Sequence, residues 1–241
     1  MSFPSWLFVI GVCVLLPVLS LRSVRNAEAA GIGRVALYAN VCLSLWLLAG
    51  ICSLVLWMDG DTAADVHLRI DVIPGPWVAI AWTVILGSGG LLLFILSHRI
   101  GSRVGWQGEE AMLHRMRPTG GGEILWIVLI LSPTAGFCEE LVYRGFLVSR
   151  LQDLTGSATA ATILSGAVFG LSHLYQGPWG ALRAGMIGLL LTAPVLTLGT
   201  IVPSMAAHAL IDALAIPLVW PLLERFRPPA NRPPRRPQQD S

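Results

Sequence analysis

The sequence has little charge: only 12% of its 241 residues are Asp, Glu, Lys or Arg. Soluble domains carry roughly 25% charged residues, so this composition excludes an ordinary soluble domain. No Lys is present, and a net charge of +2 supplies no basic face once the Arg residues are assigned to loops, which argues against a nucleic-acid partner. The four Cys residues lie in apolar stretches without CxxC spacing, so we expect neither a disulfide framework nor a thiolate zinc site.

Long apolar runs take the place of the missing charge. Hydrophobic residues make up 54% of the chain, and its mean hydropathy is +0.69. Because a bilayer-spanning helix needs about 20 apolar residues, we predict an all-α polytopic membrane helix bundle in contact with the lipid bilayer. About seven transmembrane helices are expected, with an eighth segment left open, over residues 4–21, 36–58, 74–97, 123–151, 157–175, 182–200 and 201–222.

The placement of Arg predicts the orientation of these spans. Short loops rich in basic residues stay on the cytoplasmic side. Residues 22–34, 98–117 and 224–241 together carry twelve of the sixteen Arg, whereas residues 59–71 carry four Asp and one Arg. We therefore predict an N-terminus outside and a C-terminus inside, with a first span that is retained rather than cleaved. The size of the chain and its Arg-only basicity indicate a bacterial inner (cytoplasmic) membrane.

The fourth span contains the main irregularity of the sequence. Ser132-Pro133 with Gly136 predicts a bend, because proline removes a backbone donor and clashes with the preceding turn. A helix of about 29 residues would be roughly 43 Å long, which exceeds the hydrocarbon core. The span must tilt or start in the interface, and a broken, re-entrant arrangement is the alternative.

Six ionisable residues fall at predicted membrane depth, where each charge costs at least about 2.5–3.5 kcal/mol. They are Glu139, Glu140, Arg144, His173, His208 and Asp212. Spans four and five are joined by a turn near residues 154–155. At 1.5 Å per residue, the ionisable residues on these two spans lie at similar distances from this turn, and therefore at similar depths. We expect all six residues to line one cavity. By contrast, Arg150, Asp153 and Arg183 fall at predicted span ends, and we interpret them as snorkelling to the interface.

The spacing within this set indicates its chemistry. Glu140 and Arg144 lie four residues apart on one helix face and can form an ion pair. His208 and Asp212 have the same spacing, which suits a histidine ring oriented by a carboxylate. A carboxylate beside two imidazoles in a low-dielectric cavity can activate water, while histidine can donate to an oxyanion, orient the water or bind a metal. We interpret the set as a site for hydrolysis, most simply of a peptide bond near the membrane.

Three motifs in this order resemble those of a known family. They are Glu139-Glu140-Leu-Val-Tyr-Arg144, Phe169-Gly-Leu-Ser-His173 and His208-Ala-Leu-Ile-Asp212. They look like the EExxxR, FxxxH and Hxxx(N/D) motifs of the CAAX-processing endoprotease and bacteriocin-immunity (CPBP) family of intramembrane proteases. The resemblance implies that Glu139 activates the water with help from His173. It also implies that Glu140 and Arg144 support the site, while His208 and Asp212 stabilise the oxyanion or bind metal.

The need for a metal stays open. The family is called a metalloprotease family, but a glutamate-dependent mechanism without a catalytic metal competes with that description. The sequence lacks the HExxH zinc helix. Glu139, His173 and His208 could still supply three ligands to a divalent ion such as Zn²⁺.

The resemblance divides the chain into three parts. Residues 1–120 form a membrane region of three predicted spans without a recognised motif, residues 121–223 form the catalytic membrane core, and residues 224–241 form a Pro- and Arg-rich cytoplasmic tail predicted to be disordered. We predict an intramembrane endopeptidase whose substrate is a membrane-associated peptide or protein. The alternatives are a non-catalytic immunity or membrane-binding member of the family, a haem protein that uses His173 and His208, and a proton-coupled transporter.

Overall fold

The computed structural model describes residues 1–29, 31–104 and 115–225, so residues 226–241 of the predicted tail lie outside the described residues. Every regular element in the described ranges is a helix, which confirms the all-α prediction. Six helices are long and apolar enough to cross a membrane: Phe3–Arg22, Arg34–Asp59, Pro76–Val104, Gly121–Thr155, Leu174–Leu198 and Val202–Leu223. With the shorter apolar helix Ala158–Ser172, they account for the seven predicted spans of an integral membrane protein.

The spans are built from shorter elements in chain order. The first contains α1 (Phe3–Ile10), η1 (Gly11–Leu15) and α2 (Leu16–Ala29), and it is followed by α3 (Arg34–Asp59) and α4 (Pro76–Val104). The fourth contains α6 (Gly121–Trp126), η2 (Ile127–Leu131), α7 (Ser132–Glu140), η3 (Leu141–Leu147) and α8 (Val148–Thr155). Then come α9 (Ala158–Ser172), η4 (Leu174–Gln176), α10 (Gly177–Leu191), α11 (Ala193–Leu198), α12 (Val202–Leu214), η5 (Ala215–Val219) and α13 (Trp220–Arg225).

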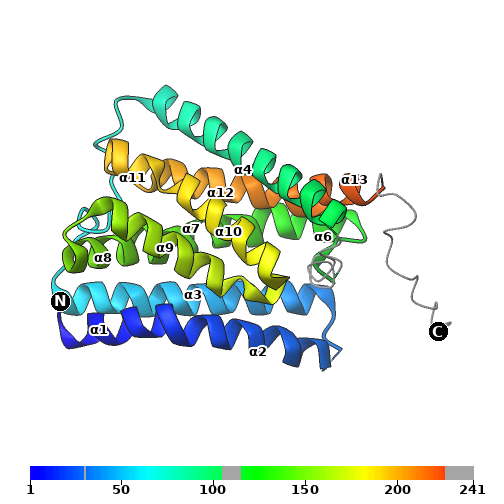
Figure 1. The fold of residues 1–241 in the computed structure, drawn as a ribbon, viewed down its shortest axis with the longest axis horizontal. Helices are drawn as coiled ribbons and strands as arrows, with labels where there is room; N and C mark the ends of the chain where they lie inside the picture. Colours follow the sequence, from blue (N-terminus) through cyan, green and yellow to red (C-terminus); the bar gives the residue numbers. More distant parts are fainter. Residues whose placement is uncertain (30, 105–114, 226–241) are drawn as a thin grey trace.

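The motif-bearing helices occupy the middle of the bundle. Figure 1 shows α1, α2 and α3 along one side, α4 along the opposite side, and α7 to α12 between them. Direct packing of α3 on α7, of α7 on α12 and of α12 on α4 agrees with this order. The first three spans therefore flank the helices that carry the three motifs.

The fourth span is one uninterrupted helix of 35 residues in place of a re-entrant arrangement. Its first wide π-helical turn, η2, lies directly before Ser132 and Pro133. A π turn shifts the hydrogen-bond register by one residue, which accommodates a proline that has no N–H to donate. A second π turn, η3, starts directly after Glu140 and contains Arg144. The first irregularity thus precedes the first motif, and the second begins within it, between Glu140 and Arg144.

The fifth predicted span, residues 157–175, is shorter than expected. Ser157 caps the start of α9 by accepting a hydrogen bond from the Ala160 amide (3.3 Å), and the helix ends at Ser172 after 15 residues. At 1.5 Å per residue it is roughly 22 Å long, less than the roughly 30 Å hydrocarbon core. Figure 1 shows the turn between α9 and α10 stopping short of the end of the bundle where α2 ends. This short hairpin therefore places His173, which follows α9, away from that end of the bundle.

Arg150 corrects one sequence interpretation, because it is buried rather than snorkelling to the interface. Its Nη2 atom lies 3.2 Å from a carboxylate oxygen of Asp59 and also forms an ion pair with Asp61. Its Nε atom donates to the Ser5 hydroxyl at 3.2 Å, and its guanidinium lies 5.2 Å from the centroid of the Phe146 ring. The cluster therefore ties α1, α3 and α8 together at the end of the bundle that carries the acidic loop.

We expect an Arg150→Ala variant to lower the free energy of unfolding by roughly 2–3 kcal/mol, because it leaves the Asp59 carboxylate without its cation close to the end of the bundle. Denaturant titration of the purified protein in detergent micelles measures this difference. Arg69→Ala is the matched control, because Arg69 forms a surface ion pair with Asp71 and exposed pairs contribute little. Equal effects of the two variants would contradict a stabilising role for the cluster.

Candidate active site

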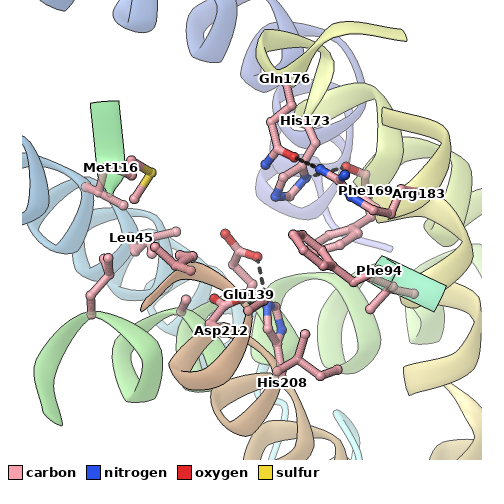
Figure 2. Close-up of a pocket in the computed structure, with 18 of the residues that line it drawn as sticks. Leu45, Phe94, Met116, Glu139, Phe169, His173, Gln176, Arg183, His208 and Asp212 are labelled. Atoms are coloured by element: carbon pink, nitrogen blue, oxygen red, sulfur yellow. Dashed lines mark hydrogen bonds and ion pairs between the residues drawn. The ribbon is translucent and has the colours of Figure 1, made fainter. Parts of the chain in front are cut away.

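A cavity of about 140 Å³ lies between α3, α4, α7, α9, α10 and α12. Four of the six predicted site residues line it: Glu139, His173, His208 and Asp212. Figure 2 shows Glu139, Asp212 and His208 together on one side of this space and His173 across from them. The other two, Glu140 and Arg144, lie behind this surface and are fully buried. The structure therefore brings the six residues together, but only four of them line the cavity that all six were expected to line.

Glu140 lies at the centre of the buried contacts. Its Oε1 atom accepts a hydrogen bond from Arg144 Nη1 at 3.0 Å, which confirms the predicted ion pair. The same oxygen lies 2.7 Å from His208 Nδ1. Because a carboxylate oxygen accepts, the Nδ1 atom donates in this contact. Glu140 therefore holds both a cation and the ring of a cavity histidine.

The four-residue spacing suggested that Asp212 orients the ring of His208. In the structure, Glu140 orients it instead. The Nε2 atom lies 3.8 Å from Asp212 Oδ2 and 3.6 Å from Glu139 Oε2, both beyond hydrogen-bond distance. A carboxylate one turn away on the same helix does not reach the ring closely, whereas α7 places Glu140 directly against it. The consequence is that His208 turns Nε2 toward the two carboxylates that line the cavity.

Gly136 explains how α7 comes so close to α12. A Cβ atom at this position would lie 2.5 Å from the carbonyl oxygen of Met205 and 2.9 Å from the amide nitrogen of Ala209. Neither backbone atom can move without shifting the helix. Glycine at residue 136 therefore allows the approach that places Glu140, one turn later, against His208.

Phe169 provides the surface on which the three motifs meet. The Arg144 guanidinium lies 4.3 Å from the centroid of its ring, within the range of a cation–π contact. The rings of His173 and His208 lie 4.5 Å and 6.0 Å from the Phe169 ring, measured between centroids. Arg144 also donates from Nε to the carbonyl oxygen of Gly188 at 3.3 Å. The Phe169 ring of the second motif thus positions the Arg144 guanidinium of the first motif.

Gly188 leaves the space that Arg144 occupies. A Cβ atom there would lie 2.7 Å from Arg144 Nη2 and 3.0 Å from Phe169 Cδ1. We expect Gly188→Ala to displace the guanidinium and to lower the free energy of unfolding by about 1–3 kcal/mol. Gly50→Ala is the control, since a Cβ atom at residue 50 would meet nothing within 4 Å. Thermal unfolding of both variants in micelles tests this, and a Gly188→Ala variant as stable as Gly50→Ala would contradict it.

His173 lies in a turn rather than within a helix. It follows the last residue of α9, with φ −100° and ψ 12°, and its Nδ1 atom donates to the carbonyl oxygen of Phe169 at 2.8 Å. That donation leaves the ring lone pair on Nε2. The turn is held by Ser172, whose carbonyl oxygen accepts from the Ser20 hydroxyl and whose hydroxyl accepts from the Tyr143 hydroxyl, both at 2.8 Å. Contacts from α2 and η3 therefore hold the turn that carries His173 in place.

Arg183 is a cavity residue that the sequence reasoning missed. It was expected to snorkel, yet it is buried, it lines the cavity, and its Nη2 atom donates to Gln176 Oε1 at 3.0 Å. Its guanidinium lies 4.7 Å from the centroid of the Phe94 ring (Figure 2). The sequence Gly177-Pro178 is a typical helix start, and this signal was missed. Helix α10 begins at Gly177, five residues before the start of the predicted span. Arg183 consequently lies well inside the bundle.

A metal site does not follow from the observed donor arrangement. Among the described residues, no three His, Cys, Asp or Glu side chains are grouped so that they could hold a metal ion. His208 donates from Nδ1 to Glu140 and His173 donates from Nδ1 to a carbonyl oxygen, so Nε2 is the nitrogen on each ring that a metal would take. Glu139, His173 and His208 share one cavity but do not form a ligand set in this conformation. A divalent ion bound by these residues therefore stays a prediction.

The three motifs fall within a stretch that matches a family of known proteins. Residues 121–214 match the Rce1-like family, described as type II CAAX prenyl endopeptidase Rce1-like. This match confirms the resemblance that the motifs indicated. It supports a membrane protease as the class of function. The Rce1-like stretch runs from the start of α6 to the end of α12, so α1 to α4 lie outside it.

One curated relative is similar over part of the chain. The "Uncharacterized protein YyaK" of Bacillus subtilis (strain 168) is 30% identical over 105 residues, which cover 40% of this chain and 35% of that protein. The match thus spans about a third of the relative's length. No solved structure matches the chain.

Proposed function

We propose that the protein is an intramembrane endopeptidase that hydrolyses a peptide bond of a membrane-associated protein or peptide. One observation carries the proposal: Glu139 and the Nε2 side of His208 face the same cavity inside an apolar bundle, with Nε2 3.6 Å from Glu139 Oε2. Behind them, the Glu140–Arg144 pair fixes the histidine ring. A preorganised carboxylate and imidazole in the wall of one cavity suit the activation of one bound water.

The proposed reaction starts with Glu139 as the base. A water molecule in the cavity gives a proton to the Glu139 carboxylate, and the lone pair on His173 Nε2 accepts a hydrogen bond from the same water. The water oxygen attacks the carbonyl carbon of the scissile peptide. His208 donates to Glu140 from Nδ1, so a second proton on Nε2 makes the ring cationic, and the nearby Asp212 carboxylate balances this charge. The Nε2–H donates to the oxyanion that forms. Glu139 then delivers its proton to the amide nitrogen as the C–N bond breaks, which gives a carboxylic acid and an amine and restores the Glu139 carboxylate.

We also propose a bacterial inner membrane with the N-terminus outside and the C-terminus inside. The support is the distribution of charge over the two ends of the bundle. Figure 1 shows α13 and the connection between α2 and α3 at one end, and the connection between α3 and α4 at the other. The first end carries Arg22 and Arg34, and the second carries the acidic residues 59–71. Met116 and Tyr175 line the cavity and pack with Leu37 near the start of α3, so the cavity lies in the half of the bundle nearer the Arg-rich end.

Comparative proteomics of membrane fractions tests the proposed function. Cells expressing the wild type are compared with cells expressing Glu139→Ala, and with Glu123→Ala as a control on the exposed start of the same span. We expect new peptide termini in the wild type and in Glu123→Ala that are missing in Glu139→Ala. If no terminus differs between equally abundant, folded samples, catalysis is unsupported and a non-catalytic family member becomes the better description. A chelator added to parallel samples tests the predicted divalent metal, such as Zn²⁺.

A further inference from the structure

Part of the cavity wall comes from outside the Rce1-like stretch. Val41 and Leu45 on α3, Phe94 on α4 and Met116 line the same cavity as Glu139, although the family match begins at residue 121. Helix α3 reaches the cavity because it packs directly on η2 and α7. The N-terminal spans therefore contribute surface to the candidate active site.

An apolar trough leads along this wall to Glu139. On the fourth span, Leu131 and Ala135 precede Glu139 at intervals of four residues, so the three side chains share one face of the helix. On α3, Val41 and Leu45 are also four residues apart and line the same space. We define the apolar trough as Val41, Leu45, Leu131, Ala135 and Ile216. The Glu139 carboxylate lies at the polar end of this trough.

The two faces of α3 have different surroundings. Val41 and Leu45 are half-buried, whereas Leu43 is 71% exposed and faces outward from the bundle, where lipid surrounds a membrane helix. Apolar side chains on the outward face are required by the bilayer. Those on the inward face are not, because polar residues such as Gln176 and Arg183 line the opposite side of the same cavity. Val41 and Leu45 also pack against neighbouring core residues, and the surface that they leave toward the cavity gives it an apolar wall that an apolar group would fill.

We infer that Val41 and Leu45 are specificity-determining residues that select an apolar side chain of the substrate next to the scissile bond. The inference rests on the proposed function of the site. A peptide with its carbonyl carbon at the water bound by Glu139 places a neighbouring side chain against the trough. An apolar side chain gains by leaving water there, whereas a charged one finds no partner among the five trough residues. The size of Val41 and Leu45 sets which apolar side chain fits.

The experiment uses purified full-length protein in lipid vesicles and quenched fluorescent peptides. The peptides carry the sequence around a terminus that depends on Glu139, with Ala, Leu or Phe at the positions flanking the bond. The quantity compared is kcat/KM for Phe-bearing peptides divided by kcat/KM for Ala-bearing peptides. We expect Val41→Phe to lower this ratio by roughly tenfold or more and Leu45→Ala to raise it by a similar factor. Pocket contacts of this size discriminate between substrates by about that amount. Leu43→Phe and Leu43→Ala are the controls on the outward face of α3.

The outcomes separate this inference from the proposed function. A ratio that stays unchanged in Leu45→Ala, with cleavage itself intact, overturns the role of the trough and leaves the endopeptidase standing. If Val41→Phe does not fold, Leu45→Ala alone decides, because it removes atoms and adds none. Equal shifts in the Leu43 variants also overturn the inference, since they would trace selectivity to a general property of α3. Failure of the wild type to cleave any of the peptides contradicts the proposed function itself.

Discussion

Glu139→Gln is expected to reduce kcat/KM for the protein's own substrate by a factor of about 10² to 10⁴, which is the contribution of a well-placed general base. The substitution keeps the size of the side chain and removes only the ability to accept a proton from water. The Glu139 side chain is 15% exposed and lies 3.6 Å from His208 on the neighbouring helix, whereas Glu140 lies 2.7 Å from the same histidine. Glu139 therefore contributes less than Glu140 to the packing of α7 on α12. The fold should therefore survive, as judged by unfolding in micelles.

The control for this loss is Glu123→Gln on the same span. Glu123 accepts a hydrogen bond from the Thr119 amide at 2.6 Å, at the end of the bundle and away from the cavity residues. We expect it to retain wild-type kcat/KM. A Glu139→Gln variant with more than a tenth of the wild-type rate, measured on the same peptide, would remove Glu139 from the role of base.

Arg144→Ala is expected to have the largest effect on stability, lowering the free energy of unfolding by about 3–5 kcal/mol. Both partners of the Glu140–Arg144 pair are buried, with side-chain exposures of 0% and 1%. Removing the guanidinium leaves a carboxylate deep in the bundle with His208 as its one remaining polar partner among the described residues. Denaturant titration in micelles measures this loss.

The double variant Glu140→Gln with Arg144→Met separates stability from activity. Replacing both charges by neutral groups of similar size should recover most of the stability that Arg144→Ala loses. Activity should stay low, because a neutral amide oxygen at position 140 can still accept from His208 Nδ1 but no longer favours the charged ring that donates from Nε2 to the oxyanion. A double variant as active as the wild type would show that the pair is purely structural.

The sequence was sufficient to predict the spans and the convergence of the six ionisable residues. Hydropathy marks apolar stretches directly, and residues such as Glu139 or His208 contrast sharply with a membrane background. Spacing of four residues predicted the Glu140–Arg144 pair because both groups lie on one helix, where geometry is fixed by the backbone.

Contacts between helices could not be predicted in the same way. Arg150 and Arg183 were expected at the interface, yet both are buried, because hydropathy does not distinguish a position that faces lipid from one that faces another helix. The orientation of His208 by Glu140 also depends on how closely α7 approaches α12, which Gly136 permits and no periodicity reveals. The end of α9 was predicted three residues too late, because Leu174 and Tyr175 are apolar and the first clear break in the sequence is Gly177-Pro178.

The N-terminal spans are part of the site rather than a separate anchor. The Ser20 hydroxyl donates to the turn that carries His173, and α3 supplies Val41 and Leu45 to the cavity. These residues lie outside the stretch that matches the Rce1-like family. Selectivity could therefore change through α2 and α3 while the three motifs stay constant.

Hydrolysis in oxygen-18-labelled water tests the central claim most directly. The purified protein in vesicles is given a peptide that carries its cleavage sequence, and the products are weighed by mass spectrometry. We predict one labelled oxygen in the new carboxyl terminus with the wild type, and no such product with Glu139→Gln. A new terminus without label, or equal labelled product from Glu139→Gln, would contradict water activation by Glu139.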